Sequence, residues 1–242
     1  MNTTLCIDLG NTRSKVAFFA GRDIKEMFIL QHELTESITG LINRFQPTKT
    51  ILSSVVDHPK AIEDTLASST QFHKLSHDSQ LPVTTPVGKP STIGADRLAI
   101  VSAAVDIFPR QHNLSIALGT CITYNFTNKM HEFLGGSISP GLYMRFKAMH
   151  DYTALLPLTE PSHNFPLIGY DTQTNLQSGV IMGVAKEIDG IIDAYSLKFN
   201  NFNVLLTGGD MPFFVPHLKN RIFADQNLIY KGLYAICAFN NK

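Results

Sequence analysis

The sequence has few cysteines, no net charge and no long apolar run. Its three cysteines, Cys6, Cys121 and Cys237, are odd in number, widely spaced and set among apolar or small residues. This excludes a disulfide framework and a cysteine zinc site, and is typical of buried thiols in a reducing compartment. The 20 basic residues balance 20 acidic ones, so no overall charge recruits nucleic acid or an anionic membrane. Any bound anion must therefore be held by a local site.

The same absences predict where the protein works. No apolar stretch approaches the roughly 20 residues that span a bilayer. The first residues, MNTTLCIDLGNT, reach a carboxylate and a glycine too soon for a signal peptide. The 242 residues, 44% of them hydrophobic, can bury a sizeable core without staples. We therefore expect a soluble, cytoplasmic protein without a membrane or nucleic-acid partner.

Apolar patterning predicts alternating strands and helices. Two short apolar runs joined by a polar turn, at residues 4–10 and 15–21, favour a hairpin. Further strand patterns lie at 28–34, 49–56, 114–126, 130–139 and 202–209, and helical patterns at 37–45, 58–68, 95–108, 140–153, 176–199 and 232–239. A segment rich in proline, residues 81–93, favours a loop that leads into the third helical pattern. These alternations predict an α/β fold.

The second half of the chain echoes the first. CIDLGNTRSKVAFF and SIALGTCITYNF share an apolar residue, Leu, Gly and Thr before a second strand. We therefore expect two α/β domains of similar build, residues 1–112 and 113–242, with a nucleotide cleft between them.

The first turn has the parts of a nucleotide grip. Asp8 ends a strand and offers a carboxylate to a metal ion, the Gly10-Asn11-Thr12 turn offers amides to phosphate, and Lys15 offers a neutralising cation. The pattern is not a P-loop, because it does not close in Gly-Lys-Ser/Thr and leads into a strand. An ordinary hairpin with a polar tip remains the alternative.

Two further motifs could bind or act on a small molecule. In Gly94-Ala95-Asp96-Arg97, Asp96 could accept a hydroxyl proton and Arg97 could pair with a carboxylate; alternatively, Asp96 is a first-turn acid and Arg97 a surface residue. Thr207-Gly208-Gly209-Asp210 follows an apolar strand, and its glycines allow close approach to a flat ligand such as adenine, or simply form a tight turn. The glycines of residues 134–141 indicate a close-packed turn, which could be purely architectural.

The order of these motifs resembles one family. DLGNTRSK, GADRLA, LGTCIT, GGSISPGLYMRFKAM, DTQTNLQSGVIMG, LLTGGD and KGLYAICAFN are similar, in that order and over the whole chain, to the motifs of type III pantothenate kinase. The resemblance implies a duplicated ribonuclease-H-like (actin-like ATPase) fold and an ATP-dependent phosphorylation of pantothenate to 4'-phosphopantothenate, the first step of coenzyme A biosynthesis. It also implies Mg²⁺, a monovalent cation (K⁺ or NH₄⁺), and a homodimer that completes each pantothenate site.

The resemblance also implies roles for individual residues. Asp96 would be the general base, and Asp8 would hold magnesium, directly or through water. Pantothenate would be bound by Gly94, Ala95, Asp96, Arg97 and Thr172. ATP and its phosphates would be bound by Asp8, Leu9, Gly10, Asn11, Thr12, Arg13, Ser14, Lys15, Thr120, Gly208 and Gly209.

Three positions depart from the family pattern. Ala117 stands where an aspartate usually serves the monovalent cation, Val87 where a tyrosine usually precedes the GADR segment, and Asn125 where an acid is common. Two alternatives therefore stay open: a degenerate homologue that only binds ligand, and a different small-molecule kinase of the same superfamily. The nine histidines are scattered, and His73 and His77, although four apart, lie in a strand-then-loop context, so we assign none to a metal or to catalysis.

Overall fold

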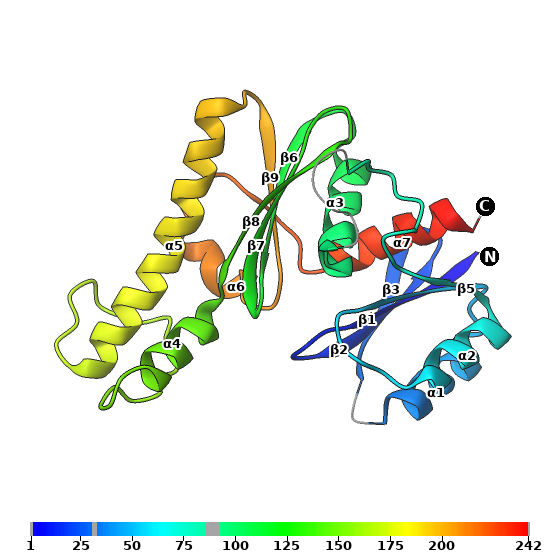
Figure 1. Cartoon of the computed structure of the whole chain (residues 1–242), viewed down its shortest axis with the longest axis horizontal. Coiled ribbons are helices and arrows are strands. Elements are labelled where there is room, and N and C mark those ends of the chain that lie inside the picture. Colours follow the sequence, from blue (N-terminus) through cyan, green and yellow to red (C-terminus); the bar gives the residue numbers. More distant parts are fainter. Residues whose placement is uncertain (1, 31–32, 86–91, 242) are drawn as a thin grey trace. The chain divides into compact units, whose positions relative to one another are not determined.

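The computed structural model describes residues 2–30, 33–85 and 92–241. The chain forms two compact units. The first comprises Met1–Pro109, His131–Phe133 and Asn227–Lys242, and the second Arg110–Met130 and Leu134–Gln226. Each contains one five-stranded mixed sheet and its own helices (Figure 1).

The first sheet has the order β3-β2-β1-β4-β5. Its strands are β1 (Thr3–Leu9), β2 (Ser14–Ala20), β3 (Asp23–Leu30), β4 (Lys49–Ser54) and β5 (Gln71–Lys74). The first three strands pair antiparallel, whereas β4 and β5 run parallel to β1. The helices are α1 (Leu34–Phe45), α2 (Lys60–Ser69), α3 (Ala95–Ile107) and α7 (Leu228–Asn240). The predicted N-terminal hairpin is confirmed as β1 and β2.

Strand alternation in β1 decides which side chains reach the site. Leu5, Ile7 and Leu9 are fully buried in one cluster with residues of α1 and α2. Cys6 is buried in a second cluster with residues of α3 and α7. Successive strand residues point to opposite faces, so Asp8 shares the face of Cys6, the one that α3 and α7 cover.

Helices α3 and α7 approach each other closely at a glycine. A Cβ added to Gly232 would lie 1.8 Å from the backbone oxygen of Ala99. Only glycine fits such a contact between helix backbones. The close packing fixes the start of α3, where the predicted GADR motif lies.

The second sheet has the order β10-β9-β6-β7-β8. Its strands are β6 (His112–Leu118), β7 (Cys121–Thr127), β8 (Phe133–Pro140), β9 (Phe202–Thr207) and β10 (Phe223–Ala224). The helices are α4 (Leu142–Asp151), the long α5 (Thr172–Lys198) and the short α6 (Met211–Phe214), which is followed by a 3-10 turn, η2 (Val215–His217). Alternate residues of β6, β7 and β9 pack with α4, α5 and α6 in one apolar core.

The two sheets repeat one topology, as the sequence echo predicted. Read as β8-β7-β6-β9-β10, the second sheet matches β3-β2-β1-β4-β5 strand for strand, with the same antiparallel and parallel pairings about β1 and β6. Helices α3 and α7 each follow the last strand of one repeat. The expected duplicated α/β fold is therefore confirmed.

The expected domain division differs from the structure near the C-terminus. Residues 113–242 were expected to form one domain, but Asn227–Lys242 belongs to the first unit. The reason is packing: Tyr230, Leu233 and Ile236 of α7 are buried against strands of the first sheet, where their apolar area leaves water. The first boundary, after Pro109, lies close to the expected one.

Two other expectations concern the helices and the proline-rich loop. None of the helices among the described residues is long and apolar enough to cross a membrane. Val87, the position expected to lack a tyrosine, lies outside the described residues. Earlier in that segment, Thr84 forms an isolated parallel bridge with Glu132.

Candidate functional site

The predicted phosphate turn lies where β1 passes into β2. Leu9 is the buried last residue of β1, Gly10 follows it, and Ser14 opens β2. A Cβ on Gly10 would lie 3.0 Å from the backbone oxygen of Arg13, so this position favours glycine. Asn11, Thr12 and Arg13 are exposed at the tip, accessible to a ligand.

Asp8 is bracketed by polar residues on both neighbouring strands. Lys15 is its register partner on β2 and Ser53 its register partner on β4. Ser53, fully buried, donates a hydrogen bond of 3.1 Å from its Oγ to Asp8 Oδ1. Cross-strand partners share one face, so carboxylate, ammonium and hydroxyl are held together by backbone pairing.

The environment of Asp8 disfavours its charge. The pKa of Asp8 is raised from 3.8 to about 6, first by burial and then by the nearby charge of Asp96. The hydrogen bond from Ser53 and the charge of Lys15 act in the opposite direction. Two carboxylates that repel each other in a partly desolvated site are relieved by a cation. A cation bound beside Asp8 would relieve this repulsion.

Asp96 and Arg97 stand at the start of α3, as predicted. Gly94 is the N-cap and Ala95 the first helical residue. The Asp96 carboxylate folds back over the cap, since a Cβ on Gly94 would lie 2.5 Å from Asp96 Oδ1. The carboxylate thus lies beside the N-terminus of the helix.

Arg97 is half-buried on the same first turn. Its guanidinium lies 5.5 Å from the ring centroid of Phe133, a cation–π contact. Burial lowers the pKa of Arg97, and the charge of Asp96 acts in the opposite direction. The structure thus brings Asp8, Asp96 and their basic neighbours into one region of the first unit, with Asp96 in the first turn of α3 and Arg97 partly buried.

The second unit repeats this strand geometry without its charges. Ala117 has the place in β6 that Asp8 has in β1, with Thr123 on β7 and Thr207 on β9 as its register partners. These residues replace Asp8, Lys15 and Ser53. Ala117 therefore corresponds in position to Asp8, and a methyl group stands where the first unit has a carboxylate.

The glycine motifs of the second unit meet around one turn. A Cβ on Gly141 would lie 2.1 Å from the Gly119 oxygen and 2.5 Å from the Thr120 oxygen, and the Gly141 amide donates to Thr120 O at 3.0 Å. Gly208 has φ +102°, and its Cβ would lie 2.2 Å from the Leu118 oxygen. Three segments are therefore packed backbone to backbone: LGT (residues 118–120), SPG (residues 139–141) and TGG (residues 207–209). Thr120 is exposed.

Gly209 lies on the open side of this cluster. It is exposed, and a Cβ there would meet nothing within 4 Å. Asp210 follows as the N-cap of α6, and its amide donates to Leu118 O at 3.1 Å. The open backbone of Gly209 can approach a flat ligand closely, as the sequence interpretation expected.

Thr172 and Asn125 have different surroundings. Thr172 is the exposed first residue of α5, directly after a capping box in which the Asp171 carboxylate accepts the Thr174 amide at 2.7 Å. Its exposure leaves it available to a ligand. Asn125 is fully buried in β7 and donates to Ser115 O at 3.2 Å; its amide is committed to the sheet.

Sequence reasoning missed two residues of the Asp8 site. Ser53 ends a buried strand, and a polar residue at a strand end next to the Asp8 strand was a usable signal. Tyr230 lies in α7, about 220 positions away, and only the fold reveals its proximity: burial first, then the charge of Asp8, raise its pKa. It adds an uncharged polar group to the same region.

The histidines form no metal centre in the structure as described. Among the described residues, no group of three or more His, Cys, Asp or Glu could hold a metal ion. His73 Nε2 lies 2.8 Å from Ser79 Oγ, whereas His77 pairs with Asp78.

Similar folds in solved structures define the class. The chain matches component A of (R)-2-hydroxyglutaryl-CoA dehydratase from Acidaminococcus fermentans with a TM-score of 0.55 at 12% identity, over 99% of this chain and 98% of that one. It matches a ROK hexokinase from Thermus thermophilus with a TM-score of 0.52 at 10% identity, over 98% of each. At these identities the likeness concerns the fold alone. The chain therefore has a duplicated ribonuclease-H-like fold.

Sequence comparison narrows the class to one family. A family model described as type III pantothenate kinase matches residues 4–194. The type III pantothenate kinase of Christiangramia forsetii is 40% identical over 238 residues, 98% of each chain, and that of Flavobacterium johnsoniae is 38% identical over 231 residues, 95% of each. The chain therefore belongs to the type III pantothenate kinase family.

Proposed function

We propose that this protein transfers the γ-phosphoryl group of ATP to the primary hydroxyl of pantothenate, giving 4'-phosphopantothenate. Family membership supports the reaction. The single observation in the fold that carries it is the meeting of Asp8, Lys15 and Ser53 with Asp96 in one region. Phosphoryl transfer depends on positioning and charge neutralisation more than on covalent catalysis, and this region supplies both.

We assign the substrate's proton to Asp96. The hydroxyl donates to the Asp96 carboxylate as the oxygen attacks the γ-phosphorus, the bond to the β-γ bridging oxygen breaks, and ADP leaves with that electron pair. Asp96 lies on the first turn of α3, where its carboxylate folds back over the Gly94 cap. Gly94 and Ala95 provide backbone groups beside it, and Arg97 pairs with the pantothenate carboxylate.

We assign the phosphates to residues 8–15. The exposed tip residues Asn11, Thr12 and Arg13 and the strand ends Leu9, Gly10 and Ser14 present backbone amides or side chains, and Lys15 supplies a cation. Asp8 would hold Mg²⁺, directly or through water, and the bound ion would neutralise phosphate charge. Thr120, Gly208 and Gly209 bind the rest of the nucleotide.

We propose that potassium or ammonium activates this chain weakly, if at all. Ala117 has no carboxylate for a monovalent cation, and its partners Thr123 and Thr207 are uncharged. Hydroxyl and carbonyl dipoles alone hold such an ion more weakly than a full charge does.

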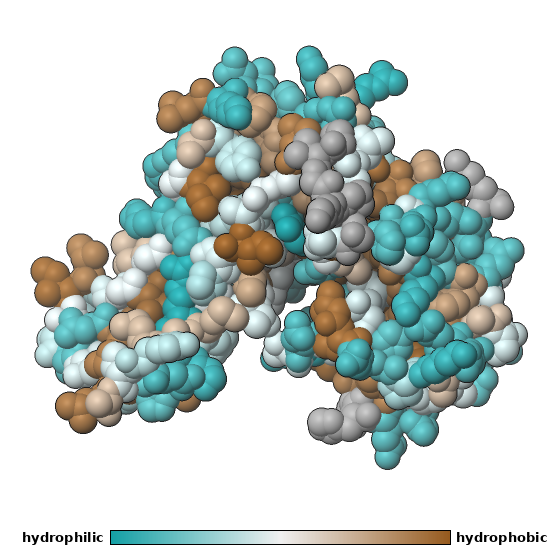
Figure 2. Space-filling model, in the orientation of Figure 1, coloured by the Kyte–Doolittle hydropathy of each residue, from teal (hydrophilic) through white to brown (hydrophobic). Residues whose placement is uncertain are grey.

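We propose a homodimer formed through α4 and the segment that follows it. Large apolar side chains between residues 143 and 170 are exposed: Tyr143, Met144, Met149, Tyr152, Leu155, Leu158, Leu167, Ile168 and Tyr170. In Figure 2, brown side chains protrude at the lower left, where Figure 1 draws α4 and the start of α5. An apolar surface of this extent favours a protein partner, and we take it to be a second copy, which brings Thr172 to the pantothenate site.

We place the protein in the cytoplasm. The helices of the described residues carry no span long and apolar enough for a bilayer, and the three cysteines are free. Free cysteines fit a reducing compartment.

A second candidate is a family member that binds ligand without turnover. Ala117 favours it, because a charge present in the pattern of the family is absent. Thermal shift with ATP does not separate the two, since both bind. A coupled assay of ADP release on addition of pantothenate, with and without potassium, separates them. A kinase releases ADP continuously, whereas a protein that binds both ligands without releasing ADP is the non-catalytic family member.

A further inference from the structure

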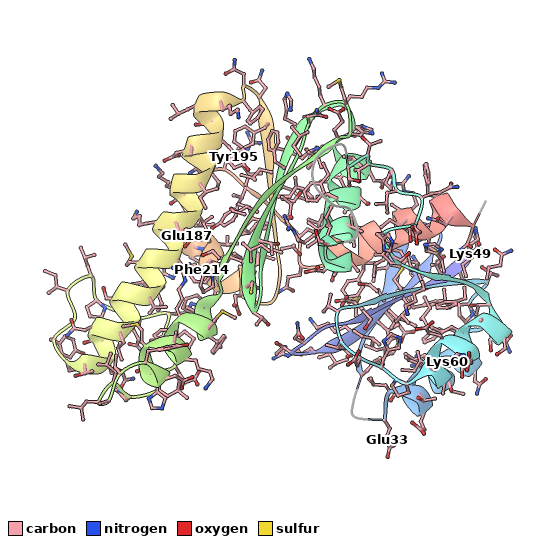
Figure 3. All side chains as sticks on the ribbon, viewed as in Figure 1. Glu33, Lys49, Lys60, Glu187, Tyr195 and Phe214 are labelled. Atoms are coloured by element: carbon pink, nitrogen blue, oxygen red, sulfur yellow. The ribbon has the colours of Figure 1, made fainter. Side chains whose placement is uncertain are left out.

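A partly buried charge network lies beneath the Gly119-Thr120 turn of the second unit. Arg145 of α4 forms an ion pair with Glu187 of α5, and the two side chains are only 21% and 25% exposed. Tyr124 of β7, fully buried, donates its hydroxyl to Glu187 Oε1 at 2.9 Å. Figure 3 shows Glu187 about midway along α5.

The network ends on the backbone of the SPG segment. Arg145 Nε donates to Pro140 O and Nη2 donates to Ser139 Oγ, each at 2.9 Å. The planar guanidinium makes these bonds and the pair with Glu187 at once, which the single ammonium of lysine cannot do in the same geometry. Ser139 and Pro140 are therefore fixed by one side chain.

Gly141, which follows Ser139 and Pro140, packs directly against the Gly119-Thr120 turn. Its amide donates to Thr120 O at 3.0 Å, and its Cα packs against the oxygens of Gly119 and Thr120 with no room for a Cβ. A shift of Ser139 or Pro140 thus moves the residue that contacts Thr120 directly. The Arg145 amide also donates to Gly141 O at 3.1 Å, the hydrogen bond that opens α4 and joins Gly141 to the helix.

Charge is well compensated within the network. Although burial opposes it, hydrogen bonds from Arg145, Ser139 and Tyr124 lower the pKa of Glu187. A compensated, partly buried ion pair with directional bonds specifies geometry more than it adds stability. Such a network suits a part of the protein that must be held still.

We propose that Arg145, oriented by Glu187 and Tyr124, is a positioning residue for the nucleotide: it holds Ser139-Pro140-Gly141 against the Gly119-Thr120 turn. This inference rests on the proposed kinase function and on the role proposed for Thr120. Arg145 does not touch the reacting atoms. It acts by fixing the backbone next to Thr120, the residue proposed to bind the nucleotide.

The test is steady-state kinetics of Arg145→Ala, Arg145→Lys and Glu187→Gln against a control, Lys219→Ala. Lys219 belongs to the same unit, lies outside α4, and its exposed side chain forms an ion pair with Asp193. We expect KM for ATP to rise roughly 10- to 100-fold in Arg145→Ala and less in Arg145→Lys, with KM for pantothenate within about 2-fold, since small misplacements of a binding group are costly. Lys219→Ala should match the wild type.

Direct binding of a fluorescent ATP analogue separates this inference from the kinase proposal. If the wild type binds the analogue but does not phosphorylate pantothenate, the kinase proposal fails, and the order of analogue affinities among the variants still tests Arg145. Wild-type nucleotide affinity in a folded Arg145→Ala, or an equal loss for both substrates, would overturn the positioning role. Should Arg145→Ala not fold, Arg145→Lys and Glu187→Gln decide, with melting and light scattering confirming an intact fold and mass.

Discussion

Replacing Asp8 by Asn should stabilise the ligand-free protein. The pKa of Asp8 is raised from 3.8 to about 6, so the folded state holds its proton more tightly than the unfolded chain does. A raised pKa gives stability that is fully present below about pH 4 and is lost as pH rises through about 6. Two pKa units correspond to about 3 kcal/mol, which is the upper limit of the gain at pH 8. Asn keeps the shape and still accepts from Ser53.

Thermal melts in metal-free buffer at several pH values measure this gain. The difference in unfolding free energy between Asp8→Asn and wild type should be near zero at pH 4 and grow up to pH 8. Asp64→Asn, on an exposed position of α2, is the control and should show no such growth. Magnesium and ATP should reverse the order, because they bind the wild-type carboxylate. Equal unfolding free energies of Asp8→Asn and wild type at pH 8 without metal would refute the raised pKa of Asp8.

Four further outcomes follow from the same structure. Asp96→Asn should fold normally and lose roughly 10²- to 10⁴-fold in turnover, as loss of a general base does; unchanged turnover removes Asp96 from the mechanism. Ala117→Asp should gain potassium activation in initial-rate assays, and equally strong activation of the wild type would contradict the account of that site. Leu155→Glu should shift the light-scattering mass towards a monomer, whereas a wild-type monomer would exclude the dimer. Gly232→Ala should lower Tm because its Cβ meets Ala99 O, and a wild-type Tm would show that the helices relax at no cost.

Contacts between residues close together in the sequence could be predicted, whereas contacts between distant residues could not. Asp8 and Lys15 lie seven positions apart in a hairpin, so local patterning predicted their pairing, and the repeated turn predicted the place of Ala117. Ser53 and Tyr230 reach Asp8 only through β4 and α7, contacts that patterning does not encode. For the same reason, the C-terminal helix α7 was assigned to the second domain instead of the first. Its apolar residues indicated burial, but not the sheet against which it packs.

The charge network shows a second limit. Arg145 and Glu187 are separated by 42 positions on two helices, and each alone is typical of a solvated helix face. Their partial burial and shared partners appear only when α4 and α5 pack on β7. Conversely, the glycines of residues 134–141 were predicted to form a tight turn, and the contacts of Gly141 confirm it.

Transfer of γ-labelled phosphate from ATP to pantothenate tests the central claim most directly. Purified protein, magnesium, labelled ATP and pantothenate are incubated, and the product is identified by chromatography and mass. The account predicts label in 4'-phosphopantothenate, dependent on pantothenate and strongly reduced in Asp96→Asn. Label that stays in ATP, or is released only as inorganic phosphate while the protein still binds both ligands, would contradict it.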